Sequence, residues 1–252
     1  MKIHVRTILL VLFCLIATSV AGEIPTPNEA LDFEIGADCT LANFDQISDY
    51  FYMLAQESDR IDIRELGHTH EGNMLFATYI SSSDNLNNID KFQRIQKQLA
   101  DPRLIDDIQA DSLFAIGKTI VCINCSIHAT EVGPAQMSLL LGYELATSNS
   151  PGVLNILEQT ILILIPVHNP DGLNIVSDWY QRYLGTKYEG CKLPRLYQKY
   201  TGHDINRDWY MLTQPETRLT VDMIYNQWHP HVVLDMHQFG KYAPRLFIPP
   251  YT

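Results

Sequence analysis

The chain has 252 residues, of which 46% are hydrophobic, 18 are lysine or arginine and 29 are aspartate or glutamate. This length and composition suffice for one buried core, and they exclude a disordered, collagen-like or coiled-coil chain. The formal net charge of −11 argues against nucleic acid as a partner, because such binding depends on basic side chains that neutralise phosphates.

The first 22 residues predict a cleavable signal peptide. Lys2 and Arg6 precede an apolar run over residues 8–20, and Ala21 supplies a small residue of the kind that signal peptidase requires. A bilayer requires roughly 20 apolar residues, and the run is shorter than that. We therefore expect a secreted, extracellular protein without a stable membrane anchor.

A short lead-in over residues 23–43 precedes the predicted domain, which begins with a helix over residues 44–57. Apolar residues recur in that helix at intervals of three to four, as in an amphipathic helix. Two short strands follow, over residues 61–66 and 75–81, around a polar turn, and they predict a hairpin. A polar helix is expected over residues 90–99.

Three apolar strands then each end in a polar sequence that contains a histidine. They cover residues 119–127, 161–167 and 231–235. Helical patterns between them, over residues 134–147 and 219–228, predict an α/β fold with a mixed, largely parallel twisted sheet flanked by helices. Sheets of this kind place ligand sites beyond the carboxyl ends of their strands.

Four cysteines remain once the signal peptide with Cys14 is removed, and an extracellular location permits disulfides between them. Cys39, Cys122, Cys125 and Cys191 allow three pairings, and the sequence does not select one. Cys122 and Cys125 are three apart in one predicted strand, so their side chains point to opposite faces. We expect both to be buried thiols rather than a disulfide.

His128, Glu131 and His237 are candidate metal ligands. Catalytic zinc takes three protein ligands and leaves one position for water. His128 and Glu131 lie three apart at a strand-to-helix turn, and His237 follows a strand as His128 does. Asp235 is a candidate hydrogen-bond acceptor for a ligand imidazole. The pair His-x-x-Glu alone is a weak signal, because most histidines at strand ends have structural roles.

Together with their surroundings, these residues resemble the zinc carboxypeptidases of the carboxypeptidase A type, over nearly all of the sequence after residue 22. Five motifs carry the resemblance in the family's order: the turn at residues 67–72, Ile127-His128-Ala129-Thr130-Glu131, Asn169-Pro170-Asp171-Gly172, Asn206-Arg207 and Asp235-Met236-His237. The resemblance implies a carboxypeptidase A-like fold and one Zn²⁺ ion bound by His128, Glu131 and His237.

The resemblance also implies a function, namely zinc-dependent hydrolysis at the C-termini of peptides or proteins by an activated water. Asn206 and Arg207 would bind the terminal carboxylate, which a guanidinium recognises with two parallel hydrogen bonds. Arg182 would stabilise the oxyanion. Arg195 is the alternative to Arg182. The stretch between Gly172 and Asn206 is long, so the motifs on either side of it do not determine which arginine aligns with that of the family.

The general base of the family is a glutamate well downstream of the third zinc ligand. No glutamate or aspartate follows His237, and we interpret Glu216 as a first-turn charge of a helix. We therefore expect residues 44–252 to be a partial catalytic domain, truncated at the C-terminus and with an incomplete sheet. Two alternatives stay open: an inactive pseudo-enzyme that binds zinc and peptides, and a secreted α/β domain without catalytic function. The sequence leaves the oligomeric state open.

Overall fold

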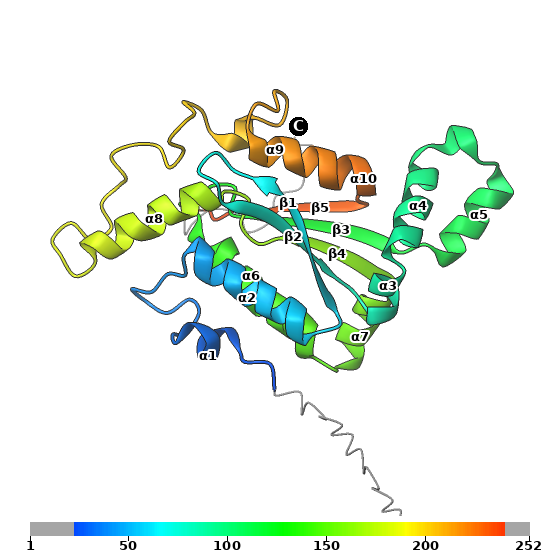
Figure 1. Ribbon diagram of the computed structural model, residues 1–252, viewed down its shortest axis with the longest axis horizontal. Coiled ribbons are helices and arrows are strands. Elements are labelled where there is room, and N and C mark those ends of the chain that lie inside the picture. Colours follow the sequence, from blue (N-terminus) through cyan, green and yellow to red (C-terminus); the bar gives the residue numbers. More distant parts are fainter. Residues whose placement is uncertain (1–22, 240–252) are drawn as a thin grey trace, which may run out of the picture.

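A five-stranded sheet organises the computed structural model, which describes residues 23–239 (Figure 1). The predicted signal peptide at residues 1–22 lies outside the described residues. The strands are β1 (Ile61–His68), β2 (Met74–Ile80), β3 (Thr119–Cys125), β4 (Thr160–Ile165) and β5 (Val232–Met236). None of the helices within residues 23–239 has the length and apolar character needed to cross a bilayer.

The strand order is β1-β2-β4-β3-β5. β1 pairs antiparallel with β2, which confirms the predicted hairpin, and β2 pairs antiparallel with β4. β3 lies between β4 and β5 and is parallel to both. The predicted mixed sheet is confirmed, and its parallel part consists of the three strands that end in histidine-containing sequences.

Helices cover both faces of the sheet (Figure 1). The α-helices are α1 (Pro27–Leu31), α2 (Phe44–Glu57), α3 (Ser83–Asn87), α4 (Ile89–Ala100), α5 (Asp107–Ile116), α6 (Val132–Thr147), α7 (Pro151–Gln159), α8 (Pro170–Tyr183), α9 (Pro215–Thr220) and α10 (Asn226–Trp228). Two 3₁₀ turns, η1 (Pro102–Leu104) and η2 (Ile205–Arg207), and a π-helical turn, η3 (Val221–Tyr225), complete the described elements.

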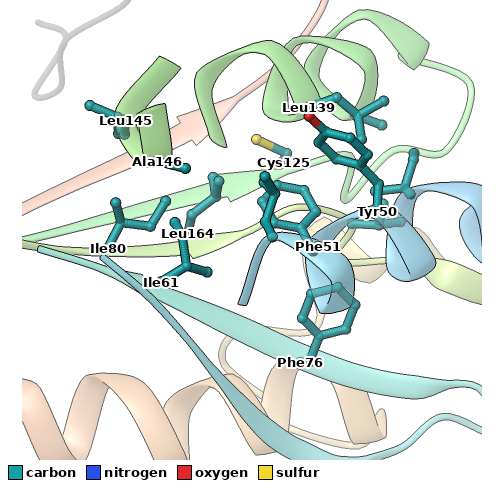
Figure 2. Close-up of a cluster of buried hydrophobic side chains, with 14 of the residues drawn as sticks. Tyr50, Phe51, Ile61, Phe76, Ile80, Cys125, Leu139, Leu145, Ala146 and Leu164 are labelled. Atoms are coloured by element: carbon teal, nitrogen blue, oxygen red, sulfur yellow. The ribbon is translucent and has the colours of Figure 1, made fainter. Parts of the chain in front are cut away.

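The larger apolar core lies between the sheet and helices α2 and α6, and Figure 2 shows part of it. Helix α2 begins where the sequence predicts, because Asn43 caps it: Asn43 Oδ1 accepts from Gln46 N at 2.9 Å, and Gln46 Oε1 accepts from Asn43 N at 3.1 Å. Its apolar stripe includes Phe51, whose ring centre lies 6.3 Å from that of Phe76 on β2. The Asn43 cap fixes the start of α2, and the apolar stripe packs the helix against the sheet.

A second core packs α4 and α10 against the opposite face of the sheet. β4 contributes to both cores, with Leu162 and Leu164 in the first and Ile161, Ile163 and Ile165 in the second. Successive side chains of a strand alternate between faces. A central strand with both faces covered is therefore apolar along nearly its whole length, as β4 is from Ile161 to Ile165.

The cysteines of β3 follow the same alternation. Cys125 lies in the first core and Cys122 in the second, and both are buried free thiols, which confirms the prediction. Burial raises the pKa of Cys122 to about 12. These thiols are protonated and unreactive at neutral pH.

The motif Asn169-Pro170-Asp171-Gly172, which follows the second apolar strand, forms the cap and the N-terminal turn of α8. Asn169 caps this helix by accepting from Gly172 N at 2.9 Å, and Pro170 occupies the first helical position, where a missing N–H costs nothing. The polar residues after β4 thus lie at the N-terminus of a helix.

Candidate metal and carboxylate site

Three predicted ligands converge beyond the carboxyl ends of β3 and β5. The parallel register pairs Cys125 with Met236, so His128 and His237 follow neighbouring strand ends. His128 Nδ1 lies 3.0 Å from Glu131 Oε1, and His237 Nδ1 lies 2.9 Å from Glu131 Oε2. One ligand atom from each of the three side chains lies within 4.8 Å of the other two. This is the separation at which one ion can bind all three.

Each imidazole has a carboxylate at its other nitrogen. His128 Nε2 lies 3.0 Å from Asp204 Oδ2, and His237 Nε2 lies 3.1 Å from Asp235 Oδ2. A carboxylate accepts only from a protonated nitrogen, so both Nε2 atoms carry hydrogen. In the neutral imidazoles the Nδ1 lone pairs then face the oxygens of Glu131.

This arrangement requires a positive charge between the Nδ1 atoms and Glu131, because lone pairs facing each other repel. In the protein alone a proton can supply it. The hydrogen bond that His237 donates to Asp235 raises the pKa of His237 to about 9, with the negative charges of Asp235 and Glu131 adding to the shift and burial opposing it. The donor set, two imidazoles and one carboxylate with outer carboxylates, fits a catalytic zinc site.

Glu131 is held by the backbone of two loops. Its own N–H donates to His128 O at 2.9 Å, closing the turn that precedes α6. Gln238 N donates to Glu131 Oε2 at 2.9 Å, and Gln238 Oε1 accepts from Gly133 N at 3.0 Å. The loop after β5 is thus fixed to the start of α6.

Asp204 also connects the triad to Asn206 and Arg207. Its Oδ1 accepts from Asn206 N at 2.8 Å, while its Oδ2 faces His128. Arg207 is exposed, and its Nη1 donates to Asn206 O at 3.1 Å. The predicted carboxylate-binding pair therefore begins two residues from a side chain that contacts the triad. Sequence reasoning missed Asp204.

A buried aspartate anchors the loop that carries these residues. Asp208 has no exposed surface and accepts from the backbone of Gln214 and from the hydroxyls of Thr213 and Thr217. Burial alone would raise the pKa of Asp208, but these hydrogen bonds outweigh it and lower the pKa to about 2. The loop is consequently attached to the start of α9.

The two arginines considered for oxyanion stabilisation lie elsewhere. Arg182 is exposed in the last turn of α8. At a rise of 1.5 Å per residue, it lies about 18 Å along the helix from Pro170. Arg195 is exposed in the segment between α8 and η2. Neither belongs to the histidine–carboxylate cluster, and the role of Arg182 stays a prediction.

Two other motifs meet at Asp171. Its carboxylate accepts from Thr69 Oγ1 at 2.5 Å, Glu71 N at 3.0 Å and Asn73 Nδ2 at 2.7 Å, all in the β1–β2 turn. It also accepts from the hydroxyl of Tyr200 at 2.8 Å. The early turn and the start of α8 are therefore fixed to each other by one buried carboxylate.

Glu216 lies in the first turn of α9, as expected, but it is fully buried. The hydroxyl of Tyr200 lies 3.1 Å from Glu216 Oε1 and 2.8 Å from Asp171 Oδ2. Burial raises the pKa of Glu216, and the negative charge of Asp171 adds to this. One hydroxyl hydrogen cannot serve two carboxylates at once, and the protonated form of Glu216, which its raised pKa favours, can donate to the oxygen of Tyr200 while Tyr200 donates to Asp171.

The sequence model of the zinc carboxypeptidases matches residues 47–247. The chain belongs to the zinc carboxypeptidase family. A probable carboxypeptidase 2 from Arthroderma benhamiae is 30% identical over 132 residues, which are 52% of this chain and 21% of that protein. The chain therefore matches about a fifth of the length of this curated relative.

Solved structures of other proteins share the fold. Thrombin activatable fibrinolysis inhibitor has a TM-score of 0.56 and 14% identity, covering 85% of this chain and 52% of that one. Carboxypeptidase A from Helicoverpa armigera has a TM-score of 0.53 and 16% identity, covering 90% of this chain and 51% of that one. These neighbours confirm the expected carboxypeptidase A-like fold.

Proposed function

We propose that this zinc carboxypeptidase family member is secreted and contributes the metal-binding and carboxylate-binding part of an enzyme that hydrolyses C-terminal residues from peptides or proteins. The convergence of His128, Glu131 and His237, with each imidazole held by an outer carboxylate, supports the proposal most directly. Secretion rests on the signal-peptide pattern of residues 1–22.

The residues of this chain have separate tasks in the proposed reaction. Bound zinc would lower the pKa of a water molecule and polarise the scissile carbonyl. Asp204 and Asp235 hold the Nε2 hydrogens of the two histidines and so keep their Nδ1 lone pairs available for the metal. Asn206 and Arg207 bind the terminal carboxylate of the substrate.

Metal binding is tested with a His237→Ala variant. We expect the full chain to retain one zinc ion per molecule after dialysis, measured by elemental analysis, and the variant to lose it, because two ligands hold zinc far less tightly than three. The control is His229→Asn, which alters an exposed histidine at the opposite end of β5. His229 has a φ of 44°, a conformation that asparagine tolerates. Zinc retained by His237→Ala would contradict the assignment.

Catalysis is tested separately, by release of C-terminal residues from a peptide mixture. The expected result is release that depends on zinc, is lost in His237→Ala and is retained in His229→Asn. Peptides bound with their C-termini intact, at full zinc occupancy, would show a binding protein and refute the hydrolytic part of the proposal.

A further inference from the structure

Trp209 contacts the predicted carboxylate-binding residue Asn206 through a single directional bond. The indole Nε1–H of Trp209 donates to Asn206 Oδ1 at 3.1 Å. An indole nitrogen is only a donor, so the amide atom that faces it is the oxygen. The NH₂ group of Asn206 is therefore directed away from Trp209, and it makes no hydrogen bond with another residue in the range 23–239.

The indole ring of Trp209 is itself fixed by two stacked neighbours. Its centre lies 5.3 Å from the ring of His168, at an interplanar angle of 29°. On η3, the ring of Tyr225 lies 5.8 Å away at 25°. His168 is fully buried, and the hydroxyl of Tyr225 accepts from Asn124 Nδ2 on β3 at 2.7 Å. The orientation of the indole is thus set by residues of the sheet and of η3.

Asn206 is consequently held from two sides. Its backbone N–H donates to Asp204 and its side-chain oxygen accepts from Trp209. A carboxylate is only an acceptor, and it is attracted by the NH₂ group of an amide and repelled by the oxygen. Without the indole N–H, the amide can rotate and present its oxygen to the substrate. The site then no longer discriminates between a carboxylate and an amide.

We propose that Trp209 is a positioning residue, which orients the Asn206 amide so that its NH₂ group faces the terminal carboxylate and the site prefers a free C-terminus to an amidated one. This role rests on the proposed carboxylate binding by Asn206 and Arg207. It is a contribution to specificity that acts through Asn206 and involves no contact between Trp209 and the substrate.

The hydrogen bond can be tested without substrate or activity. The chain contains three tryptophans. The indole of Trp179 donates to Cys191 O at 3.0 Å, and that of Trp228 donates to the hydroxyl of Tyr79 at 2.9 Å. In ¹⁵N-labelled protein, we expect Asn206→Ala to shift the indole signal of Trp209 and leave the other two in place. Trp209→Phe identifies the signal by its loss. An unshifted Trp209 signal would overturn the proposal.

Specificity is tested with phenylacetate and phenylacetamide, which share one shape and contain no peptide bond to be cut. Binding to the zinc-loaded chain is measured by calorimetry. Losing the indole N–H should weaken phenylacetate binding about tenfold in Trp209→Phe, the equivalent of one charge-assisted hydrogen bond, and leave phenylacetamide unchanged. Trp179→Phe, which removes an indole N–H elsewhere, is the matched control and should retain the preference for the acid.

The double variant Asn206→Ala/Trp209→Phe separates positioning from general packing. If Trp209 acts through Asn206, the double variant binds phenylacetate as Asn206→Ala does. A further loss in the double variant, or equal losses for acid and amide, would overturn the role of Trp209 alone. A wild-type chain that does not prefer the acid would overturn the proposed carboxylate site as well, and the indole signals would still report the hydrogen bond.

Discussion

The raised pKa of the buried Glu216 carboxyl makes the stability of the fold depend on pH. Its pKa is raised above the ordinary value of 4.5 in the folded chain, so the unfolded chain releases this proton first. As pH rises above 4.5, the folded state loses stability relative to the unfolded one until the folded pKa is reached. The contribution of Glu216 is thus most favourable in acid.

A Glu216→Gln variant tests this, because an amide NH₂ can donate to Tyr200 as the neutral carboxyl does. We expect the free energy of unfolding of the variant, relative to that of the wild type, to increase as pH rises. The increase is up to about 1.4 kcal/mol per pH unit within the titrating range. The measurement is urea denaturation from about pH 4 to about pH 8. Glu144→Gln, at an exposed position of α6, is the control. A difference that stays constant with pH would show that Glu216 is ionised when folded.

The site was partly predictable from single residues. Asp235 was identified because it lies two positions before His237 at the end of the same strand. Asp204 was missed, because it is 76 residues from the histidine it contacts and its neighbourhood has no apolar periodicity. The available signal was its place two positions before Asn206. Long-range contacts of this kind depend on how loops fold back, which local patterns do not encode.

At the scale of elements, α2 and α6 approach closely at Gly142. A β-carbon at this position would lie 2.7 Å from Phe51 Cε1 and 3.4 Å from Leu54 Cδ1. Phe51 is fully buried between α6 and the sheet and has little room to move. The glycine therefore permits the contact between the two helices.

We expect Gly142→Ala to lower the free energy of unfolding by about 1 kcal/mol, since overpacking costs about 1–3 kcal/mol and alanine regains up to about 1 kcal/mol of helix propensity. Thermal or urea denaturation measures this. Gly152→Ala in α7 is the matched control, because nothing lies within 4 Å of its added carbon, and it should stabilise the chain. Stabilisation by Gly142→Ala would refute the packing argument.

The elements that the sequence predicted are those with a regular apolar pattern. α2 is found at its predicted residues, 44–57, and the strands differ only at their ends. α5 was not predicted, because it buries no side chain and has no apolar face to recognise. α8 was missed because Asn-Pro-Asp-Gly resembles a turn, whereas here asparagine caps a helix and proline begins it.

At the scale of the whole molecule, strand order was not predictable. β2 pairs with β4 rather than with β3, the next strand along the chain. Which strands become neighbours depends on the crossovers made by helices, and apolar periodicity carries no information on this. The prediction that polar strand ends lie along one edge succeeded because parallel strands share that direction.

β5 leaves apolar side chains exposed at one side of this sheet. Within residues 23–239 it pairs only with β3, and Val232, Val233 and Leu234 are 50%, 49% and 37% exposed. An apolar edge strand is a template for pairing with another chain. We expect the 252-residue chain to self-associate as its concentration rises.

Val233→Lys should reduce this association, because a charge on an edge strand opposes pairing. Light scattering over a concentration series measures it. Met223→Lys changes a side chain of similar exposure, 44%, on η3 and serves as the control. Equal association in wild type and Val233→Lys would exclude β5 as the contact.

In the proposed site, the two oxygens of Asp204 would link metal binding to recognition of the substrate carboxylate. Oδ2 holds the histidine that faces the metal position, and Oδ1 holds the backbone of Asn206. A change in charge beside Oδ2 would alter the hydrogen bond that Oδ1 accepts from Asn206. By thermodynamic reciprocity, a carboxylate bound at Asn206 would change the affinity for the metal. Removal of the metal by a chelator would therefore change the affinity for a C-terminal peptide, and a bound peptide would change the affinity for the metal, both through Asp204.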